Sequence, residues 1–226
     1  MLRSAQHKHL TKTSMTLKLY FLRHGQTPFS QENKFCGSLD ADMTIEGEQM
    51  AEAFATAYSG YPWKAVFVSP KKRTIATAHP FCVKTGLEMQ IRPGLQEIHY
   101  GQWEGKTVSE IDTEFHDDYL KWSADPAWHA PTRGELAMAI AYRALQVVDE
   151  IKQRYPTGNV LIVSHKATIR IILCSLLGID VGRFRYRLGC PVSSVSVVEF
   201  GIHGPLLEVL GDRTHLTPEL RSLPGT

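Results

Sequence analysis

The stretch Leu17–Gly25, LKLYFLRHG, decides the fold class that we predict for this chain. Its first six residues are mostly apolar or β-favouring, which predicts a short strand over Leu17–Leu22. The strand ends abruptly in an arginine, a histidine and a glycine. Loops that follow strands carry much of the chemistry in α/β folds, so this strand end is a first candidate site.

The same pattern of a buried strand followed by a helix recurs along the chain. Apolar runs predict further strands at Ala65–Val68 and Val160–Val163, with a glycine-rich loop over residues 92–105. Helices are predicted at about residues 44–58, 71–85, 107–121, 135–155 and 165–177, and later strands at 192–200 and 206–210. Alternation of this kind predicts an α/β fold, with a mainly parallel sheet covered by helices on both faces.

Length and composition describe an ordinary globular chain. Of the 226 residues, 43% are hydrophobic and 21% are charged, and 25 basic against 23 acidic residues give a net charge of +2. A nearly neutral body argues against a general nucleic-acid or membrane-surface binder. We predict one domain over residues 16–226. Residues 1–15 are expected to be a disordered tail, or an upstream extension if Met15 is the true start.

Targeting and membrane signals are not evident in the sequence. The N-terminus has basic residues but no apolar segment of a secretory signal, and no apolar run approaches the ~18 residues that a membrane span needs. The four cysteines form no CxxC pair, which indicates neither a zinc site nor a redox pair. Scattered thiols fit a reducing compartment, so we expect a cytoplasmic protein.

Three predicted strand ends carry polar groups that are expected to converge. Arg23-His24, Ser69–Arg73 and Ser164-His165 each follow an apolar strand. A lone histidine there is more often a helix cap than a catalyst, and Arg73 alone is best explained as a solvated surface residue. Together, two histidines and two arginines form an anion pocket, because guanidinium groups match phosphate oxygens bidentately. Metal binding by this pair is disfavoured, since neither His24 nor His165 lies in an HxH or HExxH motif.

Several ordered sequence blocks resemble the histidine phosphatase superfamily, also called phosphoglycerate-mutase-like. Arg23–Thr27 is similar to its RHG[EQ]T signature, and Leu95–Gly105 is similar to its L-x-E-x-x-x-G-x-W-E-G block. Further similar blocks are Asn33–Asp40, Thr44–Gly47, Ser69–Ala78, Gly134-Glu135 and Val163–His165. The blocks occur in family order and cover roughly residues 17–200, which makes the resemblance far more specific than an RHG triplet alone.

The resemblance implies a catalytic mechanism. His24 is expected to be the nucleophile that forms a phosphohistidine. Arg23, Arg73 and His165 are expected to hold the phosphoryl oxygens, with Thr27 as a further phosphate-binding residue. Glu97 is expected to protonate the leaving oxygen and then to activate water. No metal or other cofactor is expected.

Some positions depart from the family pattern. The weaker substrate-binding candidates are Ser30, Cys36, Gly37, Glu135 and Lys166. The family often has Asn at the first of these positions and Gly at the last. A solvated Lys166 is the favoured interpretation, and contact with a substrate anion is the sharper one. The arginines of the RFRYR segment, residues 183–187, are interpreted as surface charges, with a dimer or substrate role as the alternative.

The function predicted from this resemblance is a metal-independent phosphomonoesterase. Its expected partner is a small phosphorylated metabolite, neither nucleic acid nor membrane is expected, and a homodimer is compatible with the family. One alternative is a cofactor-dependent phosphoglycerate mutase, but Glu97 and His165 are only 68 positions apart and mutases typically carry a longer insert. The other alternative is an inactive family member that binds a phosphorylated ligand.

Overall fold

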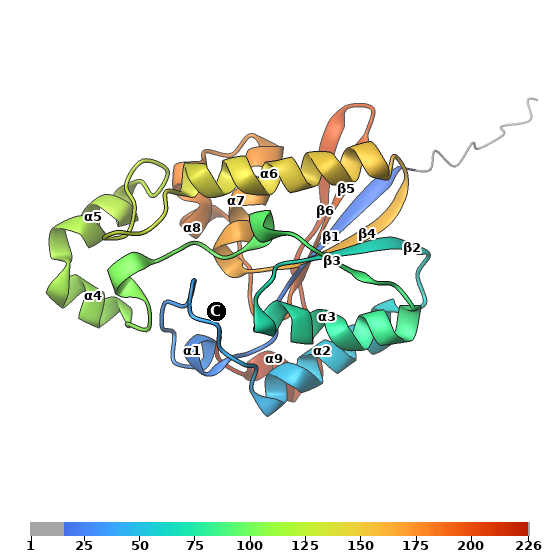
Figure 1. Ribbon diagram of the computed structural model, residues 1–226, viewed down its shortest axis with the longest axis horizontal. Helices are drawn as coiled ribbons and strands as arrows, with labels where there is room; N and C mark the ends of the chain where they lie inside the picture. The colour runs from blue at the N-terminus through green and yellow to red at the C-terminus, as the bar shows by residue number, and fades with distance from the viewer. Residues whose placement is uncertain (1–15, 226) are drawn as a thin grey trace, which may run out of the picture.

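The computed structural model describes residues 16–225 (Figure 1). The predictions for the N-terminal tail, residues 1–15, lie outside the described residues. Within residues 16–225, none of the helices combines the length and apolarity that a membrane crossing needs.

The fold is built on a six-stranded sheet with the order β3-β2-β4-β1-β5-β6. The strands are β1 Leu17–Arg23, β2 Trp63–Val68, β3 Met89–Ile91, β4 Gly158–Ser164, β5 Val195–Gly201 and β6 Gly204–Asp212. The pairs β1–β4, β2–β4 and β2–β3 are parallel, whereas β5 runs antiparallel to both β1 and β6. The prediction of a mainly parallel sheet is confirmed.

Helices cover both faces of this sheet, as predicted (Figure 1). The helices are α1 Pro28–Gln31, α2 Ile45–Tyr58, α3 Lys72–Thr85, α4 Val108–Glu114, α5 His116–Ala124, α6 Ala137–Arg154, α7 Lys166–Leu177, α8 Phe184–Arg187 and α9 Pro218–Ser222. In Figure 1, α6 and α7 lie above the sheet, and α2 and α3 lie below it. Each helix pair therefore buries one face of the strands that lead to the candidate site.

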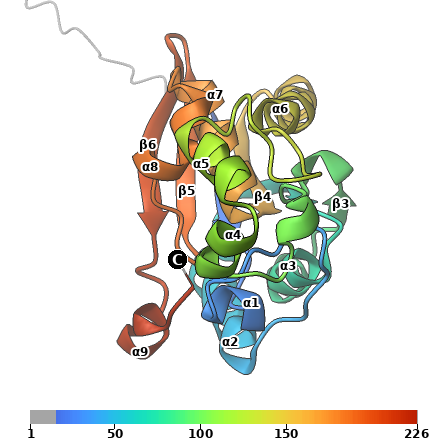
Figure 2. The ribbon, with the colours of Figure 1, turned by 90° about the vertical axis from the view of Figure 1, so that its left-hand side faces the viewer.

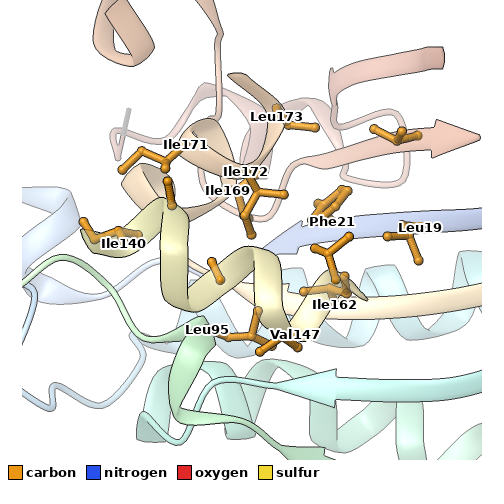
Figure 3. Packing of buried hydrophobic residues seen from close by; sticks show 14 of the residues in the cluster. Leu19, Phe21, Leu95, Ile140, Val147, Ile162, Ile169, Ile171, Ile172 and Leu173 are labelled. Carbon is orange, nitrogen blue, oxygen red and sulfur yellow. The ribbon is translucent and has the colours of Figure 1, made fainter. Parts of the chain in front are cut away.

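The larger core lies between the sheet and the pair α6 and α7 (Figure 3). Phe21 of β1 and Ile162 of β4 pack there against Ile169 and Ile172 of α7, and all four side chains are fully buried. Burying a side chain of this size contributes about 1.5–3 kcal/mol. Packing of this density fixes the two central strands, and with them the positions of the residues that follow their ends.

The helix ends follow the signals in the sequence. The Thr44 hydroxyl accepts a hydrogen bond from the Gly47 N–H at 3.0 Å, which is the N-cap expected for α2. Gly86 ends α3 in the left-handed conformation, with a φ of 71°. These caps place the beginning of α2 and the end of α3 as predicted.

Two predicted helices differ in detail from the structure. The helix predicted over residues 107–121 is two helices, α4 and α5, because Phe115 between them has the non-helical angles φ −135° and ψ 37°. Phe115 packs against the cluster of Trp103, Ile111 and Trp122. The long helix begins at Ala137 rather than at residue 135, because the Glu135 N–H is bonded to the His99 carbonyl.

Helices α4 and α5 form an extension at one end of the molecule, on the side where β1 and β4 end (Figures 1 and 2). The two views agree that α1 lies near this extension. Trp122 of α5 and Tyr100 approach each other with ring centroids 6.4 Å apart. The extension therefore forms a wall beside the carboxyl ends of the parallel strands.

His215 makes the stability of the fold depend on pH. Its ring packs edge-on against Phe54 and Tyr58, at centroid distances of 5.7 and 5.8 Å. Burial lowers the pKa of His215 from 6.5 to about 4. The unfolded chain therefore binds the proton first as the pH falls, so the stability that is present above pH 6.5 is lost toward pH 4.

We expect His215→Phe to remove part of this acid sensitivity. Between pH 6.5 and 5 the wild type loses on the order of 1 kcal/mol through this group, after allowance for its partial exposure. Urea unfolding at both pH values measures the loss, with His203→Phe, at an exposed turn histidine, as the matched control. Equal losses in the two variants would contradict the assignment.

Candidate active site

The register of two adjacent parallel strands brings the two predicted histidines together. Arg23 of β1 lies opposite Ser164 of β4, so His24 and His165 occupy equivalent positions one residue beyond the strand ends. The His24 N–H donates to the Ser164 carbonyl at 3.1 Å, and the two imidazole rings lie 5.2 Å apart. Sheet register therefore explains a proximity between residues separated by more than half the chain.

His24 is held as a neutral imidazole with one nitrogen free. Its Nδ1 lies 2.8 Å from the Gly25 carbonyl oxygen. A carbonyl only accepts, so Nδ1 carries the proton and Nε2 presents a lone pair. Burial, followed by the charges of Arg73 and Arg23, holds the pKa of His24 well below 6.5. These are the properties of a nitrogen nucleophile near neutral pH.

Arg23 is buried, and one edge of its guanidinium group has no partner within residues 16–225. Nη1 donates to the carbonyls of Cys190 and Gly225, both at 2.8 Å. Nε is buried and has no partner among the described residues. Burial lowers the pKa of Arg23 to about 10, so the group stays charged at neutral pH. An unfilled, charged donor edge is a site for an anion.

Arg73 is anchored by the loop that follows α1. Its Nη1 donates to the Leu39 carbonyl at 2.8 Å, and its Nη2 donates to the carbonyls of Gly37 and Cys36 at 3.1 and 3.3 Å. The loop is in turn held by Glu104, whose carboxylate accepts from the N–H groups of residues 37 and 38 at 2.9 and 2.7 Å. A Cβ at Gly37 would overlap the Ile98 carbonyl, so glycine is required there.

His165 is fully buried, and both of its ring nitrogens have protein partners. Nδ1 accepts from Arg73 Nε at 3.2 Å, so the proton is on Nε2, which donates to Ser69 Oγ at 2.8 Å. Burial, followed by the charge of Arg73, holds the pKa of His165 well below 6.5. To hold a phosphoryl oxygen as predicted, Nε2 has to exchange Ser69 for that oxygen.

Glu97 lies across the N-terminus of α7. Its Oε1 accepts from the N–H groups of Ile98 and Thr168, at 3.0 and 3.1 Å, and from the Thr168 hydroxyl at 3.1 Å. Within the described part of the chain, its Oε2 accepts only from the Ala167 N–H, at 3.1 Å. Oε2 is therefore the oxygen with lone-pair capacity left for a proton transfer.

A capping box at the start of α1 ties Thr27 to Ser30. The Thr27 hydroxyl accepts from the Ser30 N–H at 3.2 Å, and the Ser30 hydroxyl accepts from the Thr27 N–H at 2.9 Å. The Ser30 hydroxyl also donates to the Thr27 carbonyl at 3.0 Å. Ser30 thus uses its only hydroxyl proton within the turn. The Thr27 hydroxyl keeps its proton free for an external acceptor.

These residues surround a cavity of about 240 Å³. Eight of the predicted site residues line it, namely Arg23, His24, Thr27, Ser30, Cys36, Arg73, Glu97 and Lys166. His165 lies behind this wall, beside Arg73. Among the described residues, no group of three or more His, Cys, Asp or Glu side chains is arranged to hold a metal ion.

Glu135 lies outside the cavity and supports it indirectly. Its carboxylate accepts from Arg143 Nε and Nη2 at 2.9 and 3.0 Å. Arg143 Nη1 also donates to the carbonyls of Gly94 and Gln96 at 2.7 and 2.8 Å. The pair thereby fixes the backbone that carries Glu97. Glu135 lines a neighbouring hollow that it shares with Glu97, and not the cavity around His24.

Comparison with known proteins identifies the family. The model of the histidine phosphatase superfamily (branch 1) matches residues 19–213, which is most of the chain. The chain belongs to the histidine phosphatase superfamily. The resemblance in the sequence blocks is thus confirmed over residues 19–213.

The relatives of this histidine phosphatase include several phosphatases. Phosphoserine phosphatase 1 of Hydrogenobacter thermophilus is 29% identical over 182 residues, which cover 80% of this chain and 86% of that protein. Glucosyl-3-phosphoglycerate phosphatase of Mycolicibacterium vanbaalenii is 31% identical over 171 residues, covering 73% and 76%. The solved structure of Bacillus stearothermophilus YhfR has a TM-score of 0.82 at 27% identity, covering 88% of this chain and 98% of that one.

Arg170 is not among the residues that sequence patterns indicated, and for Arg185 they favoured a surface charge over a dimer or substrate role. Arg170 of α7 and Arg185 of α8 both line the cavity. Arg170 follows Lys166 by four residues, and this helical spacing was the signal available for it. Arg185 was interpreted as a surface charge, but its guanidinium carbon lies 3.9 Å from the centroid of the Trp122 ring. Its neighbour Arg187 is exposed, as expected.

Proposed function

We propose that this histidine phosphatase hydrolyses the phosphate monoester of a small metabolite through a phosphohistidine intermediate. One observation carries the proposal: the free Nε2 of a neutral His24 lines the same cavity as the unpartnered donor edge of Arg23. A nucleophile beside a fixed cationic donor group is what phosphoryl transfer requires, since catalysis there consists mainly of positioning and electrostatic stabilisation.

In the first step, His24 Nε2 attacks phosphorus and the ester P–O bond breaks. The new N–P bond leaves the imidazole with a positive charge, which the Gly25 carbonyl stabilises through Nδ1–H. Arg23 and the Thr27 hydroxyl bind phosphoryl oxygens, and Arg73 adds charge beside them. Glu97, in its protonated form, gives its proton to the leaving oxygen from Oε2.

In the second step, the Glu97 carboxylate removes a proton from water while that water attacks phosphorus. The N–P bond breaks, orthophosphate leaves and His24 returns to its neutral form. Glu97 is protonated again and ready for the next cycle. His165 supports both steps as a positioning residue, because its Nδ1 accepts from Arg73 Nε at 3.2 Å and so orients that guanidinium group.

Hydrolysis is favoured over the mutase and the inactive binder. The two phosphatases named above support hydrolysis, and the residues proposed as nucleophile, proton donor and charged donors all line one cavity. Release of phosphate from p-nitrophenyl phosphate separates an enzyme from a binder, and conversion of 3-phosphoglycerate to 2-phosphoglycerate identifies a mutase. The four cysteines are free thiols, which supports a cytoplasmic location.

The reaction is expected to need no metal ion. Excess EDTA should leave the rate of p-nitrophenyl phosphate hydrolysis unchanged, because protein side chains supply the positive charge. Vanadate should inhibit competitively, since its oxygens fill the donor edge of Arg23 and its centre accepts His24 Nε2. Steady-state kinetics measure both effects. A large loss in EDTA that magnesium or zinc restores would point to a different phosphatase chemistry.

A further inference from the structure

The cavity carries more positive charge than one phosphoryl group needs. Its charged lining residues are Arg23, Arg73, Arg170, Arg185, Lys34, Lys166 and Glu97. Lys34 is paired with Glu32 at 2.6 Å, but none of the other five cations makes an ion pair within residues 16–225. The two negative charges of a phosphate ester dianion balance the two cations nearest His24, which are Arg23 and Arg73. Three cations remain without an ion-pair partner among residues 16–225, and Glu97 is the one carboxylate in the lining.

These three cations lie on neighbouring elements. Lys166 and Arg170 are one helical turn apart on α7, which places them on the same face. Arg170 Nε is buried and has no partner among the described residues. Lys166 is half-buried in the cavity wall. Arg185 of α8 is fixed over the Trp122 ring and donates to Ser123 Oγ at 3.2 Å. Unpaired cations are costly to bury unless a ligand compensates them.

We propose that Lys166, Arg170 and Arg185 form a subsite for a second anionic group of the substrate, a carboxylate or a second phosphate. The inference rests on the proposed phosphatase function and adds the substrate class: small phosphate monoesters that carry another negative charge a few bonds from the ester. Burial, followed by the charges of Arg23 and Arg170, lowers the pKa of Lys166 to about 7. A bound anion compensates this repulsion and restores the ammonium form.

Matched substrates test the proposal. Glycerol 3-phosphate lacks a second anion, 3-phosphoglycerate adds a carboxylate and glycerol 1,3-bisphosphate adds a phosphate. A charge-assisted contact changes affinity by about 10–100-fold, so kcat/KM for one or both doubly anionic esters should exceed that of glycerol 3-phosphate by such a factor. The ester with the larger ratio identifies the anion. Ratios near one for both esters in the wild type would overturn the proposal.

Variants of the subsite residues test which side chains cause the preference for doubly anionic esters. The preference should fall about tenfold or more in Lys166→Met and in Arg170→Met, and should persist in Arg187→Met, which removes the same charge from the exposed neighbour of the cavity. If Arg170→Met does not fold, as judged by its thermal transition, Arg170→Gln replaces it. A preference that survives in both folded variants assigns the anion to other residues and overturns the proposal.

Different results would contradict the phosphatase function and the second-anion subsite. If p-nitrophenyl phosphate and all three esters are left intact, the phosphatase function fails. Calorimetric dissociation constants for 3-phosphoglycerate, glycerol 1,3-bisphosphate and glycerol 3-phosphate then decide the subsite on their own. Tighter binding of either doubly anionic ester supports it, and equal binding of all three overturns it.

Discussion

His24→Ala is expected to lower kcat/KM for phosphate esters by ~10⁴–10⁶-fold, because removal of a nucleophile abolishes the covalent route. The ring is nearly buried, and its Nδ1 donates one hydrogen bond to a carbonyl of the adjacent residue. Alanine removes that bond and leaves a small space without disturbing the sheet. The protein should therefore remain folded while turnover is lost.

Two measurements make this result specific. Wild-type enzyme quenched during turnover of a ³²P-phosphate ester should carry acid-labile, base-stable label, and His24→Ala should carry none. His79→Ala, at an exposed histidine of α3, is the control for the loss of an imidazole and should be labelled like the wild type. Near-wild-type turnover by His24→Ala would rule out the phosphohistidine mechanism.

Glu97→Gln is expected to discriminate between leaving groups. An alkyl alkoxide needs a proton to depart, whereas p-nitrophenolate does not. Glutamine keeps the size of the side chain, and its carbonyl oxygen keeps the capacity to accept from α7, but it cannot transfer a proton. General acid catalysis is typically worth ~10²–10⁴-fold, so phosphorylation of His24 by an alkyl phosphate should slow by such a factor and that by p-nitrophenyl phosphate far less.

The comparison requires the pre-steady-state burst, because Glu97 also activates water in the second step. Glu135→Gln is the matched control: its carboxylate is paired with Arg143 outside the cavity, so it should change both burst rates by the same factor. A leaving-group effect in Glu135→Gln, together with its absence in Glu97→Gln, would transfer the proton-donor role to Glu135.

Local sequence patterns were sufficient to predict the strand ends. Leu17–Leu22 and Val160–Val163 are apolar runs that form strands wherever both faces are covered, and the polar residues after them must then meet at one sheet edge. His24 and His165 follow from this rule without knowledge of the loops. The family resemblance added Glu97, which lies in the irregular segment after β3 where no periodic pattern exists.

The environment of each side chain could not be predicted in the same way. Sequence patterns favoured a solvated Lys166 over contact with a substrate anion. In the structure it is half-buried and lines the cavity together with residues of α4, α5 and α8. Arg185 changes from a surface charge to a cavity residue because Trp122, distant in sequence, provides a ring beneath it. Such burial depends on how loops pack, which residue type and spacing do not encode.

The place of β1 in the sheet has a consequence for biosynthesis. β1 is the first of the described strands to leave the ribosome, yet its neighbours β4 and β5 begin at Gly158 and Val195. At about 5–20 residues per second, β1 waits roughly 7–27 s for its first partner. Arg23 waits longer, since its carbonyl acceptors belong to Cys190 and Gly225. The nascent chain thus presents an unpaired apolar strand for most of its synthesis, which makes it a natural client for chaperones.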